Sequence, residues 1–137
     1  MTADEVAARL GLAPHPEGGA YAETYRHVAE DGQRGACTAI YYLLRAGERS
    51  HWHKVDAVEV WAWHAGAPLR LRVAGAADTV LGPDLAAGQR PQAVVPPHAW
   101  QAAEPLGEWS LVSCVVAPAF DFAGFTLAPP GWQPEGE

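Results

Sequence analysis

The 137-residue sequence has few cysteines, little positive charge and no long apolar run. Two cysteines are too few for a disulfide framework, and both lie in apolar stretches, so we expect buried free thiols. No apolar stretch approaches the roughly 20 residues that a membrane helix needs. The acidic N-terminus lacks the basic and apolar regions of a signal peptide. We therefore expect no membrane partner and a cytoplasmic location.

The scarcity of basic residues also argues against one class of partner. Nine basic residues stand against 16 acidic ones, which gives a net charge of −7 at pH 7. Nucleic-acid binding depends on neutralising phosphates, so we expect no nucleic-acid partner. A hydrophobic content of 49% in a chain of this length is typical of one globular domain with a substantial core. With no linker and no internal repeat, the prediction is a single domain over residues 1–137.

The order of polar and apolar residues predicts mostly short strands. Residues 3–11 should form a short helix that Gly11 ends, so that residues 1–14 comprise this helix and a lead-in. Strands are expected over residues 20–27, 37–44, 51–66, 68–75, 79–81, 91–95, 100–104 and 109–117. Residues 129–137 are rich in proline and glycine and should form a flexible tail. Many short strands with frequent turns predict an all-β sandwich or barrel.

Residues 47–66 carry three of the six histidines and three of the six tryptophans. The second half of this stretch alternates with period two, as an extended strand does. One predicted face carries Glu59, Trp61 and Trp63, and the other carries Val58, Val60 and Ala62. A carboxylate on the same face as two large aromatics indicates a lined pocket, because a core built only for burial would avoid the charge. His51 and His53 are two residues apart, so we expect a strand to aim both the same way.

The same stretch resembles the first motif of the cupin superfamily. That motif reads Gly, five residues, His, one residue, His, three or four residues, Glu, six residues, Gly. Its positions fall on Gly47, His53, Val55, Glu59 and Gly66, with valine in place of the second histidine. The second cupin motif, Pro, one residue, Gly, two residues, His, is similar to residues 96–101. There His98 takes the glycine position and Gln101 the position of the metal-binding histidine.

The closer resemblance is to the fifth cupin family, which comprises small stand-alone cupins long classed as a domain of unknown function. The segments that carry it are HPEGGAYAETYR (15–26), TAIYYLL (38–44), HKVDAVEVW (53–61), RPQAVVP (90–96) and WQAA (100–103). The resemblance implies an all-β, double-stranded β-helix or jelly-roll barrel with a short N-terminal helix. It implies much less about activity.

Three hypotheses compete for the predicted pocket, and the first is a metal site. Imidazole and carboxylate ligands suit Zn, Mn, Fe or Ni. Val55 cannot ligate a metal and Gln101 is a weak neutral donor, but His51 could replace the missing histidine. The candidate ligands are therefore His51, His53, Glu59 and Gln101.

The second and leading hypothesis is metal-free acid–base chemistry on a small polar or cyclic metabolite, as in an isomerase, an epimerase or a related lyase. A histidine beside a carboxylate is a natural general base. The family resemblance implies a precedent, because metal-free sugar epimerases among the cupins use a histidine base and a tyrosine acid. Here His53 would be the base, Glu59 its orienting partner, and Tyr41 or Tyr42 the acid, with Tyr41 as the chosen candidate.

The third hypothesis is a binding or sensor domain without turnover, in which tryptophans stack on a ring and polar groups hold its edge. The predicted ligand-binding residues are His51, Trp61, Trp63, His98, Trp100 and Gln101. A remaining alternative is that His51 and His53 only hydrogen-bond to backbone.

Two further expectations concern residues outside this stretch. We interpret three charged residues near the first strand, Glu17, Glu23 and Arg26, as solvent-facing side chains that pair locally. The alternation of the strand places Glu23 on the opposite face to Arg26. The apolar face formed by Val58, Val60 and Ala62 is too large for an isolated chain. We therefore expect it to be covered in a homodimer.

Overall fold

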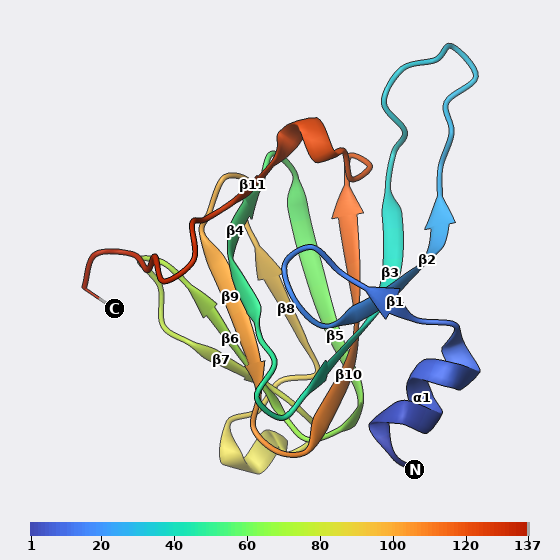
Figure 1. Ribbon diagram of the computed structural model, residues 1–137. Helices are drawn as coiled ribbons and strands as arrows, with labels where there is room; N and C mark the ends of the chain where they lie inside the picture. The colour runs from blue at the N-terminus through green and yellow to red at the C-terminus, as the bar shows by residue number, and fades with distance from the viewer. Residues whose placement is uncertain (137) are drawn as a thin grey trace.

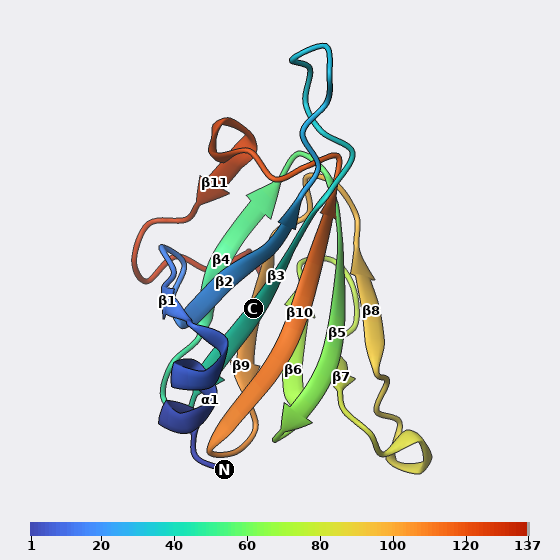
Figure 2. The same cartoon turned by 90° about the vertical axis from the view of Figure 1, so that its right-hand side faces the viewer.

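The computed structural model describes residues 1–136 as two antiparallel sheets that face each other (Figures 1 and 2). The six-stranded sheet has the order β1 (Ala13–Pro14), β2 (Ala20–Arg26), β3 (Thr38–Arg45), β10 (Trp109–Ala117), β5 (Val58–Gly66) and β8 (Gln92–Val95). The five-stranded sheet has the order β11 (Phe125–Leu127), β4 (Ser50–Val55), β9 (Gln101–Pro105), β6 (Leu69–Val73) and β7 (Thr79–Leu81). The all-β prediction is confirmed.

Helices are short in this fold. The α-helix α1 (Ala3–Leu10) begins where the Thr2 side chain accepts a hydrogen bond from the Glu5 N–H at 3.2 Å, which satisfies one of the unpaired donors of the first turn. It ends at Gly11, whose φ of 67° directs its N–H to the carbonyl of Ala7. Two 3₁₀ turns, η1 (Leu85–Ala87) and η2 (Phe122–Gly124), complete the elements. In the described part of the chain, no helix is long and apolar enough to cross a membrane.

The inward faces of the two sheets form the main core. Its fully buried members are Tyr42, Leu44, Trp61, Leu69, Leu71, Leu81, Val95, Ala103, Val112 and Cys114. The predicted alternation of β5 is confirmed, because Glu59 and Trp61 are buried whereas Val58, Val60 and Ala62 keep partial exposure on the other face. The core fills one end of the space between the sheets and leaves a pocket at the other.

Two β-bulges change which side chains point inward. In β4 the pairing with β9 shifts between Ser50 and His53, and in β2 the pairing with β3 shifts between Glu23 and Tyr25. An extra residue in one strand reverses the alternation beyond it. The prediction that His51 and His53 share a face is therefore wrong.

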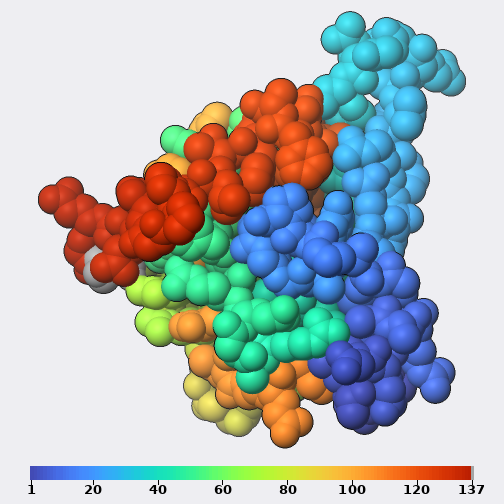
Figure 3. All heavy atoms as spheres, viewed as in Figure 1, coloured from blue at the N-terminus to red at the C-terminus, as the bar shows by residue number. Residues whose placement is uncertain are grey.

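Two segments lie outside the sandwich body. Residues 27–37 form a long arm between β2 and β3 that projects away from the sheets (Figures 1, 2 and 3). After β10 the chain crosses the open end of the sandwich through η2 and β11. Trp132, in the predicted flexible tail, then packs against Trp52 and Trp100 on the outer face of the five-stranded sheet. Residue 137 of that tail lies outside the described range.

Candidate functional site

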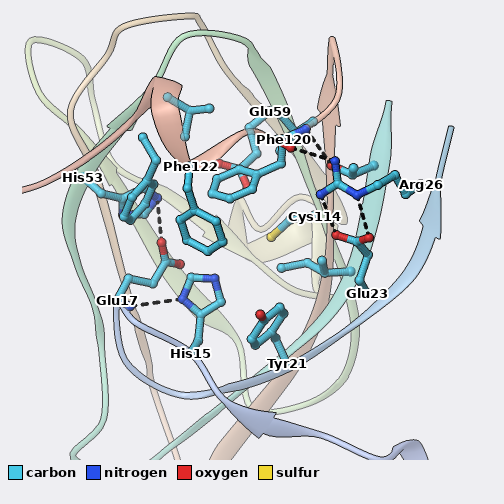
Figure 4. Close-up of a pocket in the computed structure, with 15 residues that line it drawn as sticks. His15, Glu17, Tyr21, Glu23, Arg26, His53, Glu59, Cys114, Phe120 and Phe122 are labelled. Atoms are coloured by element: carbon cyan, nitrogen blue, oxygen red, sulfur yellow. Dashed lines mark hydrogen bonds and ion pairs between the residues drawn. The ribbon is translucent and has the colours of Figure 1, made fainter. Parts of the chain in front are cut away.

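A small cavity of about 60 Å³ lies between the sheets at the end crossed by η2 (Figure 4). Both sheets, the turn before β2 and the η2 segment contribute to its walls. Its polar lining residues are His15, Glu17, Tyr21, Glu23, Arg26, Thr38, His53, Glu59 and Cys114. Its apolar lining residues are Ile40, Val55, Val116, Phe120, Phe122 and Phe125. A space of this size limits a ligand that fits without rearrangement to a few heavy atoms.

His53 is only 2% exposed, and both of its ring nitrogens have partners. Its Nδ1 lies 2.8 Å from the carbonyl oxygen of His51, and because a carbonyl only accepts, Nδ1 carries a proton. Its Nε2 lies 3.2 Å from Oε2 of Glu17 (Figure 4). One proton is therefore shared between Nε2 of His53 and the carboxyl group of Glu17. The predicted orienting partner, Glu59, does not make this contact.

Glu17 was predicted to lie at the surface, but it is buried, with only 8% of its surface exposed. Its Oε1 accepts a hydrogen bond from the Ser50 hydroxyl at 2.8 Å. Burial raises the pKa of Glu17, against opposing contributions from His15, Ser50 and Tyr42. Burial also lowers the pKa of His53. Both pKa shifts favour the uncharged pair, in which the Glu17 carboxyl donates to Nε2 of His53.

A tight turn brings Glu17 to this position. Gly18 has a φ of 112°, and a Cβ there would lie 2.1 Å from the carbonyl oxygen of Arg49, so the turn requires glycine. The carbonyl of Glu17 also accepts the His51 N–H at 2.9 Å, which fastens the turn to β4. The HPEGG sequence contained this signal, but the contact with β4 is not local.

Glu59 is the second buried carboxyl group of the cavity. Burial is the main cause that raises its pKa to about 7, with His53 and Gln101 opposing the shift. The Gln101 Nε2 donates to Oε1 of Glu59 at 2.8 Å, and the Trp61 Nε1 donates to Oε1 of Gln101 at 2.9 Å. Because an indole N–H can only donate, it fixes the orientation of the Gln101 amide. The Cys114 thiol also lies against Glu59, and burial raises the pKa of that thiol well above its usual value.

The predicted acid, Tyr41, lies elsewhere. It is on the outer face of the six-stranded sheet, with its ring 6.2 Å from that of His64. The inward-facing neighbour is Tyr42, because successive residues of β3 alternate. The Tyr42 hydroxyl donates to the carbonyl of Gly18, and burial followed by the nearby Glu17 raises its pKa well above the usual value. Tyr41 therefore does not line this cavity.

The three predicted stacking tryptophans do not line the cavity. Trp61 is fully buried in the core, and Trp63 packs beside it with its Nε1 donating to the carbonyl of Ala67 at 3.0 Å. Trp100 lies on the outer face of the five-stranded sheet, 4.5 Å from Trp132 between ring centroids. Phenylalanines of the η2 segment and Tyr21 supply the aromatic surface instead.

Two predicted histidines are also outside the cavity. Because of the bulge in β4, the Nε2 of His51 turns to the carbonyl of Pro129 at 2.9 Å. His98 is exposed in the turn after β8, with a φ of 66°. This left-handed conformation favours glycine and explains why the cupin motif has glycine at this position.

The predicted metal ligands do not converge. His51 points away from His53, and the Gln101 amide already bridges Trp61 and Glu59. Over residues 1–136, no group of three or more His, Cys, Asp or Glu side chains is arranged to hold one metal ion. The side chains present therefore do not fit the metal site of the cupin motifs.

Glu23 and Arg26 form the rim of the cavity. Arg26 makes two hydrogen bonds of 2.9 Å to Glu23, so their expected local pairing is observed. The bulge in β2 places both on the pocket side, whereas opposite faces were predicted. Arg26 also donates to the carbonyl of Phe120 at 3.0 Å, which joins β2 to the segment that covers the cavity.

Comparison with known proteins identifies the class. Residues 4–128 match the family described as Cupin superfamily (DUF985), so the chain belongs to that family and its fold is a cupin jelly roll. None of the curated proteins compared with the chain matches it significantly.

Solved structures agree with the family assignment. A protein from Shewanella oneidensis is 40% identical, with a TM-score of 0.89, over 93% of this chain and 85% of that one. A hypothetical protein from Leishmania major is 32% identical, with a TM-score of 0.85, over 93% of this chain and 88% of that one. KdgF from a Halomonas species is 14% identical, with a TM-score of 0.62, over 82% of this chain and 91% of that one, a likeness of fold alone.

Proposed function

We propose that this cupin is a metal-independent enzyme that binds a compact polar metabolite in the cavity and isomerises it by proton transfer. The observation that carries the proposal is that two separate proton-holding groups face one small, buried space. Glu59 forms one wall, and the hydrogen-bonded pair of Glu17 and His53 forms another. Perturbed carboxyl groups that face the same cavity are typical of acid–base sites.

The two groups suit different roles. With a pKa of about 7, Glu59 is partly ionised at neutral pH and can both accept and return a proton. The Gln101 amide holds its Oε1, which fixes the carboxyl group at the cavity wall. His53 has both nitrogens engaged, so it acts together with Glu17 as a proton donor. Glu59 thus replaces His53 as the proposed base.

Hydrogen–deuterium exchange tests this proposal. A panel of small hydroxy, keto and amino compounds is incubated with the protein in D₂O, and loss of each C–H signal is followed by ¹H NMR. We expect protein-dependent exchange into at least one compound, reduced about 10²- to 10⁴-fold by Glu59→Gln. Glu17→Gln should also reduce it. Glu104→Gln, which changes a half-exposed glutamate paired with Arg70 outside the cavity, should have no effect.

Two outcomes would contradict the proposal. Exchange that survives Glu59→Gln would remove Glu59 from its role. Binding of a panel compound without any exchange, detected by ligand-observed NMR, would instead indicate a binding or sensor protein.

We also propose that the chain forms a homodimer through the outer face of the six-stranded sheet. Val60 pairs across the sheet with Val115 on one side and Val94 on the other, which makes an apolar row over three strands. Val94 is 59% exposed and Val115 is 38% exposed. Val115→Asp should therefore yield monomers in sedimentation velocity, whereas Val28→Asp, on the projecting arm, should not. A wild-type protein that sediments as a monomer at all concentrations would contradict this proposal.

A further inference from the structure

We infer that His15 is a catalytic hydrogen-bond donor to a carbonyl oxygen, and that the substrate is a compact, uncharged carbonyl compound with a removable C–H next to that carbonyl. The inference rests on the proposed proton transfer and names its substrate class. His15 was absent from the residues predicted to form the site.

The position of the His15 ring is fixed by its neighbours. The residue lies in the turn before β2, is half-buried and lines the cavity. Its ring contacts that of Tyr21 edge-on at 4.5 Å between centroids and lies 5.4 Å from that of Tyr42. Two aromatic contacts leave little freedom to rotate, so the ring nitrogens keep their directions.

Hydrogen bonding determines the tautomer of His15. The backbone N–H of Glu17 donates to Nδ1 of His15 at 3.0 Å, and a nitrogen that accepts cannot carry a proton. The neutral ring therefore has its proton on Nε2. Burial, the largest effect, also lowers the pKa of His15, which opposes a second proton even though the nearby Glu17 favours it.

The Nε2–H of His15 faces the cavity. Figure 4 shows this nitrogen on the side of the ring turned towards Cys114, whereas Nδ1 is turned towards Glu17. Within residues 1–136, no hydrogen-bond acceptor meets it. A donor that is half-buried and directed into a ligand-sized space is suited to an oxygen of the ligand.

The chemistry of proton abstraction requires such a donor. When Glu59 removes the proton of a C–H beside a carbonyl, the C–H electron pair forms a carbon–carbon double bond and the negative charge moves to the carbonyl oxygen. A neutral imidazole N–H can stabilise that oxygen, as it does in known enolisation sites. The Glu17–His53 pair then protonates the same carbon from its opposite face, and the electron pair of the carbon–carbon double bond forms the new C–H bond as the carbonyl is restored. Glu59 passes the abstracted proton back to the Glu17–His53 pair, so both groups regain their starting state, the product is an isomer and no co-reactant is consumed.

The charge and the size of the cavity narrow the class of substrate further. The cavity already contains the Glu17 and Glu59 carboxyl groups, and the guanidinium at its rim, Arg26, is paired with Glu23. A carboxylate ligand would find no unpaired cation among the lining residues. An uncharged hydroxyketone or hydroxyaldehyde of a few heavy atoms fits both constraints.

The first test uses the protein alone. Long-range ¹H–¹⁵N correlation spectra of the imidazoles distinguish the two neutral tautomers and the charged ring. We expect His15 to be neutral with its proton on Nε2 at neutral pH. A proton on Nδ1, or a doubly protonated ring, would overturn the inference whatever the fate of the proposed function.

The second test uses exchange in D₂O with hydroxyacetone, dihydroxyacetone and glyceraldehyde as probes, and lactate as the charged comparison. We expect exchange into a carbonyl probe and none into lactate. His15→Phe should reduce it about 10²- to 10³-fold, the usual effect of losing one oxyanion donor. His15→Gln, which can present an N–H, should restore part of it. His27→Phe is the matched control, because His27 also accepts a backbone N–H on Nδ1 but lies outside this cavity.

The outcomes separate the inference from the proposed function. Exchange into lactate or an amino acid but none of the carbonyl probes would overturn the substrate class and leave proton transfer standing. Carbonyl exchange that depends on Glu59 but is unchanged in His15→Phe would overturn the role of His15 alone. The absence of exchange into every compound of the broad panel would overturn both.

Discussion

The two ends of the space between the sheets differ in chemistry although the same strands build them. Strand β5 places Glu59 in the cavity and, two residues later, Trp61 in the core. One end is filled by aromatic and aliphatic side chains, and the other holds carboxyl and imidazole groups around a small space. Inward direction alone therefore does not make a residue part of the site.

The two ends are joined by a chain of hydrogen bonds. Trp61 belongs to the core end, Glu59 to the cavity end, and Gln101 bridges them. A buried polar group is costly without a partner, and each carboxyl group of the cavity has one. The rigid core thereby fixes the geometry of the Glu59 carboxyl group, which is what a proton-transfer site needs.

The largest predicted effect on stability comes from the core end. Trp61→Ala should lower the free energy of unfolding by about 3–5 kcal/mol, because it leaves a cavity and removes the donor to Gln101. Urea denaturation followed by far-UV circular dichroism measures this. Trp132→Ala, which truncates a half-exposed tryptophan outside the sheets, is the control and should cost less. Equal losses would show that the core end is not the main source of stability.

The second prediction uses pH to reveal the cavity end. The pKa of Glu59 rises from an ordinary 4.5 to about 7 on folding, so the folded state holds its proton more tightly than the unfolded chain. The Glu59 contribution to stability is therefore present below pH 4.5 and is lost as pH rises to about 7, a loss of about 3 kcal/mol.

Glu59→Gln tests that prediction because glutamine does not titrate and can still accept from Gln101. Between pH 4.5 and pH 7, the free energy of unfolding of the wild type should fall by about 3 kcal/mol more than that of the variant. Chemical denaturation of both proteins at each of these two pH values measures the difference between their free energies of unfolding. Because Glu17 and His53 titrate in both proteins, their contributions are reduced in that difference. A constant difference would mean that Glu59 has an ordinary pKa when folded.

The third prediction breaks the connection between the ends. Gln101→Leu leaves the Trp61 N–H and the Glu59 carboxyl group without their shared partner, which should cost about 1–3 kcal/mol of unfolding free energy. The Gln101 hydrogen bond lowers the pKa of Glu59, so its loss should raise that pKa above about 7. Titration of the ¹³C-labelled Glu59 carboxyl by NMR measures the shift. An unchanged pKa would show that Gln101 only fills space.

The elements of the fold were predictable because their signals are local. The alternation in β5, the glycine that ends α1 and the position of β10 all follow from neighbouring residues. The all-β class and the cupin resemblance follow from the sequence alone. Glu59 was also identified, because a carboxylate inside an apolar strand is unusual in any context.

Much of the site could not be predicted because its causes are not local. The bulge in β4 adds one residue without changing the polar pattern, so the alternation of the strand did not show that His51 and His53 point in different directions. Glu17 is buried only because its turn packs on β4 and meets Ser50 and His53. Trp61 was predicted to line the pocket because it shares a strand face with Glu59. Core and cavity residues of one strand point the same way, so the shared face could not separate them.

The smallest predicted effect distinguishes the two histidines of β4. His51→Ala should cost about 1 kcal/mol or less, because it removes one hydrogen bond to the Pro129 carbonyl at the surface. Exchange catalysed in the cavity should be unchanged, since the His51 backbone carbonyl still accepts from Nδ1 of His53. His53→Gln in the same assay should lose most of the exchange, because the proton shared with Glu17 is gone. If His51→Ala reduced exchange as much as His53→Gln, both side chains would act at one site, and the bulge would not separate them in solution.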